Sequence, residues 1–157
     1  MTPAVLAAEA AGIAHRVIQY EHDASSASYG LEAAEALGLD ELSVFKTLIA
    51  SVDSGEMVVA MVGVGAMLDL KALARAAGAK RAAMADVAAA ERSSGFVAGG
   101  ISPLGQRTAL RTFIDEWITV LDEVHVSGGR RGLEIALAPS DLVALTNAVV
   151  APIATTD

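Results

Sequence analysis

The chain carries one lysine inside a segment that otherwise has the pattern of a buried strand. Lys46 lies in Phe45-Lys46-Thr47-Leu48, and the largely apolar residues 49–52 follow it directly. Burying an unpaired ammonium group is costly, so a lysine here indicates a pocket in which its head meets an anion or a carbonyl. The alternative is a strand-edge lysine whose stem lies along apolar surface while the ammonium group stays in water.

A glycine-rich segment, residues 99–105, could present backbone N–H groups to an oxyanion. Its sequence is Gly-Gly-Ile-Ser-Pro-Leu-Gly, and such a composition fixes an unusual backbone path. That path can aim N–H groups at a carbonyl oxygen or a phosphate, although a plain connection between strands has a similar composition. The segment lacks the nucleotide-binding patterns, and Leu104 replaces the last glycine of a Gly-x-Ser-x-Gly elbow.

A second glycine-rich segment, residues 127–134, holds an arginine pair between glycines. Its sequence is Ser-Gly-Gly-Arg-Arg-Gly-Leu-Glu. The glycines would let the backbone approach a ligand closely while the guanidinium groups contact phosphate. A hairpin turn with solvated arginines explains the same pattern, so the segment alone does not decide between the two.

Other chemistry-bearing residues give weaker signals. His15, His22 and His125 are not at the spacing of metal ligands, and the chain has no cysteine. The sequence therefore excludes thiolate metal sites, disulfides and a protein thiol nucleophile. Residues 43–46 match the Ser-x-x-Lys acylation motif, but the partner motifs of that enzyme class are missing, and we interpret the match as coincidental.

The composition predicts one globular domain without a membrane span. The chain has 157 residues, 54% of them hydrophobic, and no apolar run approaches the roughly 20 residues of a membrane helix. No basic region precedes an apolar stretch at the N-terminus, so no secretion signal is expected, and a cytoplasmic location follows by default.

The net charge of −8 argues against DNA or another polyanion as a tightly bound partner of the isolated chain. The basic residues are nevertheless clustered, with adjacent pairs at Lys80-Arg81 and Arg130-Arg131, so a local positive rim is compatible with the acidic body. We therefore expect free nucleic acid to bind weakly and with strong salt dependence.

Capping residues and glycines divide the chain into helices that must position these segments. Thr2, Asp69 and Asp86 can act as N-caps, and Gly12 and Gly78 can end helices in the left-handed conformation. Helices are predicted over residues 3–11, 30–37, 70–77, 87–94 and 139–146.

Strands are predicted between these helices. Asp53-Ser54-Gly55 indicates a hairpin turn between the Lys46 strand and a return strand over residues 57–62. Further strands are expected in four segments: 13–20, 111–114, 124–127 and 133–137. Helices interspersed with strand pairs predict a single α+β domain over residues 1–157, built on a mixed β-sheet.

The motifs keep a characteristic order along the chain. They are Thr2-Pro3-Ala4-Val5, Tyr20-Glu21-His22-Asp23, Val44-Phe45-Lys46-Thr47-Leu48, Leu68-Asp69-Leu70-Lys71, Gly78-Ala79-Lys80, Met84-Ala85-Asp86, residues 99–106, Ile114-Asp115 and residues 126–134. In this order they resemble the YbaK/EbsC-like aminoacyl-tRNA deacylases, which are related to the editing domain of bacterial prolyl-tRNA synthetases. The resemblance extends to about Leu145 and favours the Cys-tRNA(Pro) deacylase branch.

The resemblance implies a fold, an activity and a set of site residues. The fold would be a mixed sheet curled into a partial barrel with surrounding helices, and the activity hydrolytic release of a mischarged amino acid from tRNA, without a cofactor. Mischarged tRNA would be the substrate, with prolyl-tRNA synthetase as a partner. Lys46 matches the family's pocket lysine and would be the catalytic residue. The substrate-binding positions carried over are Tyr20, Thr47, Gly99, Gly100, Ile101, Ser102, Pro103, Ser127, Gly128, Gly129, Arg130 and Glu134.

The branch it resembles uses the substrate's own cysteine thiol, which attacks the ester carbonyl and leaves as a cyclic thiolactone. In such chemistry the protein mainly positions the reacting groups and stabilises the charge that develops on the carbonyl oxygen. Lys46 would hold the carbonyl or the terminal phosphate region, N–H groups of residues 100–102 would stabilise negative charge, and Arg130 would contact the nucleotide.

The chain departs from the family pattern at Gly63, at Gly65-Ala66-Met67 and at Arg111. These positions are expected to shape loops, which leaves fine substrate choice open.

Two other classes of function remain compatible with the residues. One is a non-catalytic module that binds an aminoacyl-adenosine or a small anion. The other is a small-molecule ester hydrolase with Ser102 or Ser127 as the nucleophile, for which His125 is the only histidine close in sequence to either serine.

Overall fold

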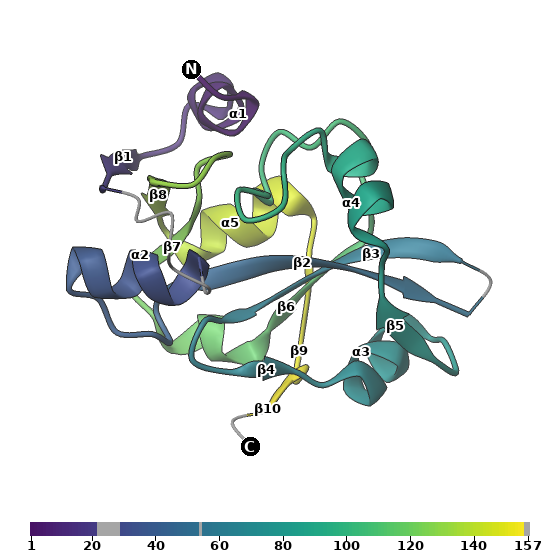
Figure 1. Ribbon diagram of the computed structural model, residues 1–157. Helices are drawn as coiled ribbons and strands as arrows, with labels where there is room; N and C mark the ends of the chain where they lie inside the picture. Colours follow the sequence, from purple (N-terminus) through teal and green to yellow (C-terminus); the bar gives the residue numbers. More distant parts are fainter. Residues whose placement is uncertain (22–28, 54, 156–157) are drawn as a thin grey trace.

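The computed structural model describes residues 1–21, 29–53 and 55–155. Three positions used in the sequence analysis lie outside these residues: His22 and Asp23 of the second motif, and Ser54 of the predicted hairpin turn. The predicted α+β class is confirmed, with helices and strands interspersed along the chain (Figure 1).

The central sheet has five strands and is mixed. Its spatial order is β5 (Ala82–Met84), β2 (Phe45–Val52), β3 (Glu56–Gly63), β6 (Thr112–Asp115) and β9 (Val149–Ala151). The pairs β5–β2 and β2–β3 are antiparallel, whereas β3–β6 and β6–β9 are parallel. The predicted hairpin is confirmed, since Val52 pairs with Glu56 across the turn, where both Asp53 and Gly55 have positive φ.

A second sheet is antiparallel, in the order β1 (His15–Gln19), β8 (Leu133–Leu137) and β7 (Val124–Ser127). A parallel bridge between Val44 and His125 joins it to the central sheet, and the His125 N–H donates to the Ser43 carbonyl at 3.0 Å. The short strands β4 (Met67–Leu68) and β10 (Ala154–Thr155) form a third pair. None of these sheets closes on itself within the described strands, so the partial barrel stays a prediction.

The helices are α1 (Pro3–Ala11), α2 (Tyr29–Leu37), α3 (Leu70–Ala77), α4 (Val87–Ser94) and α5 (Pro139–Thr146), with one 3₁₀ turn, η1 (Glu116–Val120). The predicted caps are confirmed. Thr2 accepts from the Val5 N–H, and Asp69 and Asp86 accept from N–H groups in the first turns of α3 and α4. Gly12 and Gly78 end their helices in the left-handed conformation.

Five short elements were not predicted from the sequence: β4, β5, β9, β10 and η1. Each has five residues or fewer, and β5 contains two alanines, which favour strands weakly. Pairing with β2 keeps β5 extended. The Asp53 carboxylate also accepts the N–H groups of Lys80 and Arg81, which ties the hairpin turn to the segment that leads into β5.

Apolar residues cover both faces of the central sheet. On β2, Phe45 and Ile49 pack into the core shared with α1, α4 and the second sheet, whereas Ala50 and Val52 pack on the other face with Leu73 of α3. In Figure 1, α3 and α4 accordingly lie on opposite sides of the β2–β3 hairpin. Because side chains alternate along a strand, Lys46 and Thr47 project to opposite faces.

Candidate active site

The outer edge of β2 is open at the residues that the sequence analysis singled out. At one end the Ser43 carbonyl accepts from His125, and at the other the Ile49 carbonyl accepts from the Ala85 N–H at 3.0 Å. Between them, residues 45–48 have no partner strand on this edge within the described chain. Since alternate residues direct their N–H and C=O to the same edge, those of Thr47 face the gap.

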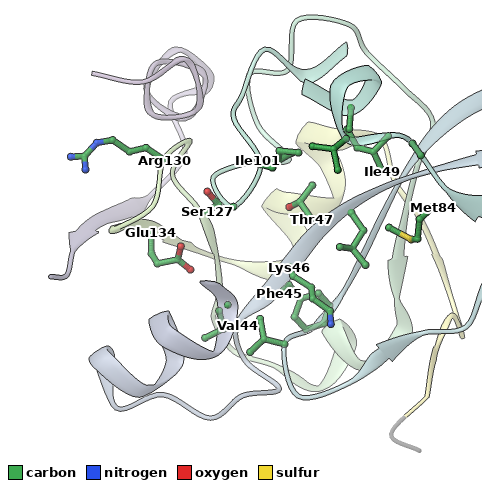
Figure 2. Close-up of a pocket in the computed structure, with 18 of the residues that line it drawn as sticks. Val44, Phe45, Lys46, Thr47, Ile49, Met84, Ile101, Ser127, Arg130 and Glu134 are labelled. Atoms are coloured by element: carbon green, nitrogen blue, oxygen red, sulfur yellow. The ribbon is translucent and has the colours of Figure 1, made fainter. Parts of the chain in front are cut away.

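A cavity of about 400 Å³ occupies this gap (Figure 2). Eight of the predicted site residues line it: Tyr20, Lys46, Thr47, Gly99, Ile101, Ser127, Arg130 and Glu134. Five do not, namely Gly100, Ser102, Pro103, Gly128 and Gly129. The structure thus brings together segments that are more than about one hundred positions apart in sequence, from Tyr20 to Glu134.

The residues that do not line the cavity hold its two glycine-rich loops together. A Cβ at Gly100 would lie 2.7 Å from the Arg130 Cα, so the loops touch backbone to backbone only because residue 100 is glycine. Gly128 accepts a hydrogen bond from the Thr2 hydroxyl, which ties the second loop to the start of α1. Ser102 is fully buried, and its hydroxyl accepts from the Leu104 N–H.

Three oxygen-bearing side chains form one wall of the cavity. Thr47 comes from β2, Ser127 from β7 and Glu134 from β8, where Ser127 and Glu134 are directly paired. Figure 2 shows the Thr47 hydroxyl pointing toward Ser127, and the Glu134 carboxyl turned toward the same space. The Thr47 Oγ1 atom is buried without a hydrogen-bond partner among the described residues.

Glu134 is 6% exposed, and none of the described residues donates a hydrogen bond to its carboxyl group. Burial removes the carboxyl group from water and disfavours its ionised form, which raises the pKa of Glu134 to about 8. The free protein therefore carries a predominantly neutral carboxylic acid in this wall at pH 7.

This shift predicts how stability depends on pH. The folded state keeps the Glu134 proton up to about pH 8, whereas the unfolded chain releases it near the ordinary value of 4.5. The free energy of unfolding should therefore fall as the pH rises from 5 to 8, by on the order of 3 to 4 kcal/mol from this one group. Glu134→Gln should remove that fall in urea titrations at pH 5, 6.5 and 8, while Glu9→Gln, on an exposed surface of α1, should keep it. Equal pH slopes for wild type and Glu134→Gln would contradict the assignment.

Lys46 lines the cavity on the other side of the β2 edge. In Figure 2 its ammonium group points away from Ile101 and Ser127, as the alternation with Thr47 requires. Half-burial lowers the pKa of Lys46, and no acidic side chain of the described residues pairs with it. The cavity thus has a cation on one side and an acid on the other.

The structure limits two predicted substrate contacts, that of the Arg130 guanidinium group with a nucleotide and that of the Gly100 N–H with an oxyanion. Arg130 lines the cavity, but its exposed guanidinium group points away from it in Figure 2, so any nucleotide contact would lie outside. The Gly100 N–H donates to the Val97 carbonyl at 2.9 Å and is not free for an oxyanion. Of the three predicted N–H donors only that of Ile101 can still meet an oxyanion in the cavity, because Ser102 is fully buried and does not line it.

Tyr20 follows β1, and its N–H donates to the Gly132 carbonyl at 2.9 Å. Its ring packs beside the cluster of Ala33, Ala34, Val44 and Val64. Burial raises the pKa of the Tyr20 hydroxyl, so this group stays a hydrogen-bond donor at neutral pH.

A serine–histidine pair is not formed. His125 Nε2 lies 3.7 Å from the Glu123 carboxylate, and His125 Nδ1 has no hydrogen-bond partner among the described residues. The Ser127 hydroxyl instead accepts from the Gly129 N–H at 3.1 Å. Within the part of the chain that the structure describes, neither Ser127 nor the buried Ser102 is hydrogen-bonded to a histidine that could activate it.

Sequence reasoning missed the apolar wall opposite these polar groups. It consists of Met84, Ala85, Val87, Ala90 and Ala98, from β5, α4 and the loop after α4. In the sequence, Met84 and Ala85 are visible only as part of a family motif, and alanine and valine side chains carry no reactive group that would mark a site.

The departures from the family pattern lie outside the cavity lining. Arg111 forms a bidentate ion pair with Glu56 (2.8 and 2.9 Å), and Gly63 and Gly65 lie against Leu42 and Glu41. Val64, between the two glycines, does line the cavity. These departures can therefore affect substrate choice through neighbouring lining residues, namely Val64 and also Phe45, which pairs with Gly63.

The part of the chain that the structure describes contains no group of three or more histidine or acidic side chains arranged to hold a metal ion. None of its described helices combines the length and apolarity that crossing a membrane requires.

Comparisons with known proteins agree on one family. The model of the aminoacyl-tRNA editing domain matches residues 25–145. A protein of Enterococcus faecalis, provisionally named Cys-tRNA(Pro)/Cys-tRNA(Cys) deacylase EbsC, is 35% identical over 144 residues, which cover 90% of this chain and 88% of the relative.

Two solved structures are similar over nearly the whole chain. One, described provisionally as a trans-editing enzyme for prolyl tRNA synthetase, has a TM-score of 0.85 at 28% identity and covers 99% of both chains. The hypothetical protein APE2540 has a TM-score of 0.87 at 23% identity, covers 98% of this chain and 100% of its own, and supports the fold alone.

Proposed function

The chain belongs to the aminoacyl-tRNA editing domain family, in its YbaK/EbsC group, and from that premise we propose that it is a trans-editing deacylase for mischarged aminoacyl-tRNA. The observation that carries the proposal is the cavity at the open edge of β2, which unites the Lys46 segment with both glycine-rich loops. Residues 1–157 would act as one editing domain.

Cys-tRNA(Pro) is the substrate that we propose. The E. faecalis relative carries that substrate in its name. The apolar wall of the cavity suits a weakly polar side chain such as that of cysteine. The acidic net charge supports a second part of the proposal, in which prolyl-tRNA synthetase supplies much of the tRNA affinity.

Among the described residues no candidate protein nucleophile is paired with an activating histidine, which supports substrate-assisted cleavage. The chain has no cysteine, Ser102 is buried, and Ser127 is not bonded to His125. In the proposed reaction the cysteine sulfur bonds to the carbonyl carbon, the ester C–O bond breaks, and the thiol proton passes to the departing ribose oxygen. The product is a β-thiolactone, which water then opens to free cysteine.

The protein would contribute positioning and charge. Lys46 would hold the carbonyl or the terminal phosphate region, and the N–H group of Ile101, which lines the cavity, would stabilise the developing oxyanion. Tyr20 and Thr47 would shape the site around the aminoacyl group.

A panel of tRNA(Pro) species charged with cysteine, serine, alanine or proline tests this function. We expect Cys-tRNA(Pro) to be hydrolysed at least about 100-fold faster than Ser-tRNA(Pro), since the two differ only in the atom that would attack. Adding prolyl-tRNA synthetase should lower KM more than it raises kcat. Equal hydrolysis of the cysteinyl and seryl esters would exclude thiol assistance, and no hydrolysis of any ester would favour the non-catalytic binding module.

A further inference from the structure

Thr47, Ser127 and Glu134 form a wall of the cavity that is called here the oxygen wall, and the proposed reaction gives Ser127 and Glu134 no ligand. That reaction assigns Lys46 and a backbone N–H group to the carbonyl, and it leaves the α-amino group of the substrate without a partner. Yet Glu134 is only 6% exposed, lines the cavity and lacks a hydrogen-bond partner among the described residues. Buried polar groups of this kind are costly and normally have a partner in the working complex.

The side chains of the oxygen wall present only oxygen atoms to a ligand. The three side chains offer a carboxyl group and two hydroxyl groups, and no nitrogen donor among them. Among the described residues the buried Thr47 hydroxyl has no hydrogen-bond partner. The Ser127 hydroxyl accepts a hydrogen bond from the Gly129 N–H. A primary ammonium group has three N–H donors, which oxygen atoms of these three side chains can accept.

Lys46 adds an orienting effect. It lies on the other side of the β2 edge from the oxygen wall, as Figure 2 shows. A ligand with a cation at one end and an anion at the other would therefore bind in one direction. An aminoacyl-tRNA terminus has this polarity, because its α-ammonium group lies at one end and its phosphates at the other.

We propose that the oxygen wall, with Glu134 at its centre, binds the free α-ammonium group of the aminoacyl ester, so that the enzyme rejects esters whose α-nitrogen is blocked. This inference rests on the proposed function, because it assigns the substrate's amino group to that same cavity. Peptidyl-tRNA and N-acylated aminoacyl-tRNA would then be spared, since an amide nitrogen carries no charge and would leave Glu134 unpaired.

The test compares Cys-tRNA(Pro) with N-acetyl-Cys-tRNA(Pro), which keeps the thiol and the ester. For the wild type we expect kcat/KM to be at least about 100-fold lower with the N-acetyl ester. Glu134→Gln should lower the value for the free ester while leaving that for the N-acetyl ester nearly unchanged, so that the ratio falls toward one. Thr47→Val, which keeps the side-chain volume, should reduce the ratio partly, and Glu9→Gln on exposed α1 should not change it.

A binding measurement separates this inference from the proposed function. The probes are 3′-cysteinylamino-3′-deoxyadenosine, whose amide resists hydrolysis, and its N-acetyl form, with affinities measured by calorimetry. Tighter binding of the free amine by wild type, lost in Glu134→Gln, supports the inference even if no ester is hydrolysed. Equal affinities, or equal hydrolysis of the free and N-acetyl esters by wild type, overturn it while leaving a deacylase in place.

Discussion

Lys46→Ala should lower kcat/KM for Cys-tRNA(Pro) by at least about 100-fold while the protein stays folded. Lys46 is the one cation whose side chain lies in the cavity among the described lining residues, since the guanidinium group of Arg130 points away from it. In a partly desolvated site, removing one group that stabilises transition-state charge typically costs two to three orders of magnitude, roughly 10²–10³ in rate.

The loss should come from the charge and not from packing. Lys46→Met keeps most of the apolar stem and should be as inactive as the alanine variant. Burial lowers the pKa of Lys46 and no acid of the described chain compensates it, so the charge opposes folding and both variants should melt at or above the wild-type temperature.

Lys71→Ala is the matched control, because Lys71 is exposed on α3, far from the cavity lining. It should retain wild-type turnover in the same single-turnover assay. Near-normal hydrolysis by Lys46→Met would show that the ammonium group has no part in the reaction and that the residue serves packing alone.

Gly100→Val should also abolish turnover, through a different cause. A Cβ at this position would lie 2.7 Å from Cα, 3.1 Å from the carbonyl carbon and 3.2 Å from the nitrogen of Arg130. These are backbone atoms, which cannot rotate away, so the two glycine-rich loops must separate. We expect a loss of about 2–3 kcal/mol in the free energy of unfolding and a fall of at least about 100-fold in kcat/KM, because misplacing reacting groups by about 1 Å can cost that much.

Gly12→Ala separates loss of stability from loss of geometry. Gly12 has a φ of +68° at the end of α1, and a Cβ there meets nothing within 4 Å. Alanine in this conformation should cost about 1–2 kcal/mol with full activity at a temperature where both variants are folded. Activity of Gly100→Val equal to that of Gly12→Ala would mean that contact between the loops does not position the site.

The local elements of the fold could be predicted because their signals are short-range. Thr2, Asp69 and Asp86 cap their helices within three residues, and the hairpin turn lies between two strands of clear pattern. The strands β5 and β9 could not be predicted, because two or three residues are held extended by a partner strand rather than by their own preference.

The candidate site was predicted in pieces. Side chains alternate along a strand, so Lys46 and Thr47 of β2 must project to opposite faces of the sheet. That both still line one cavity depends on the open edge of β2, which the pattern of the strand does not reveal. The use of the Gly100 N–H by Val97 and the outward direction of Arg130 depend on the paths of two loops, which composition does not specify.

The amino-acid sequence by itself determined the helices, the hairpin, the lysine in an apolar strand and the two glycine-rich segments, because each depends on neighbours within a few positions. The tertiary structure alone decided that β2 keeps an open edge between β7 and β5, and that Glu134 is enclosed there without a partner among the described residues. The physical reason is that strand pairing and desolvation are set by segments distant in sequence: β8 brings Glu134 beside Ser127, and water is excluded only once α2, β2 and both loops have closed around them.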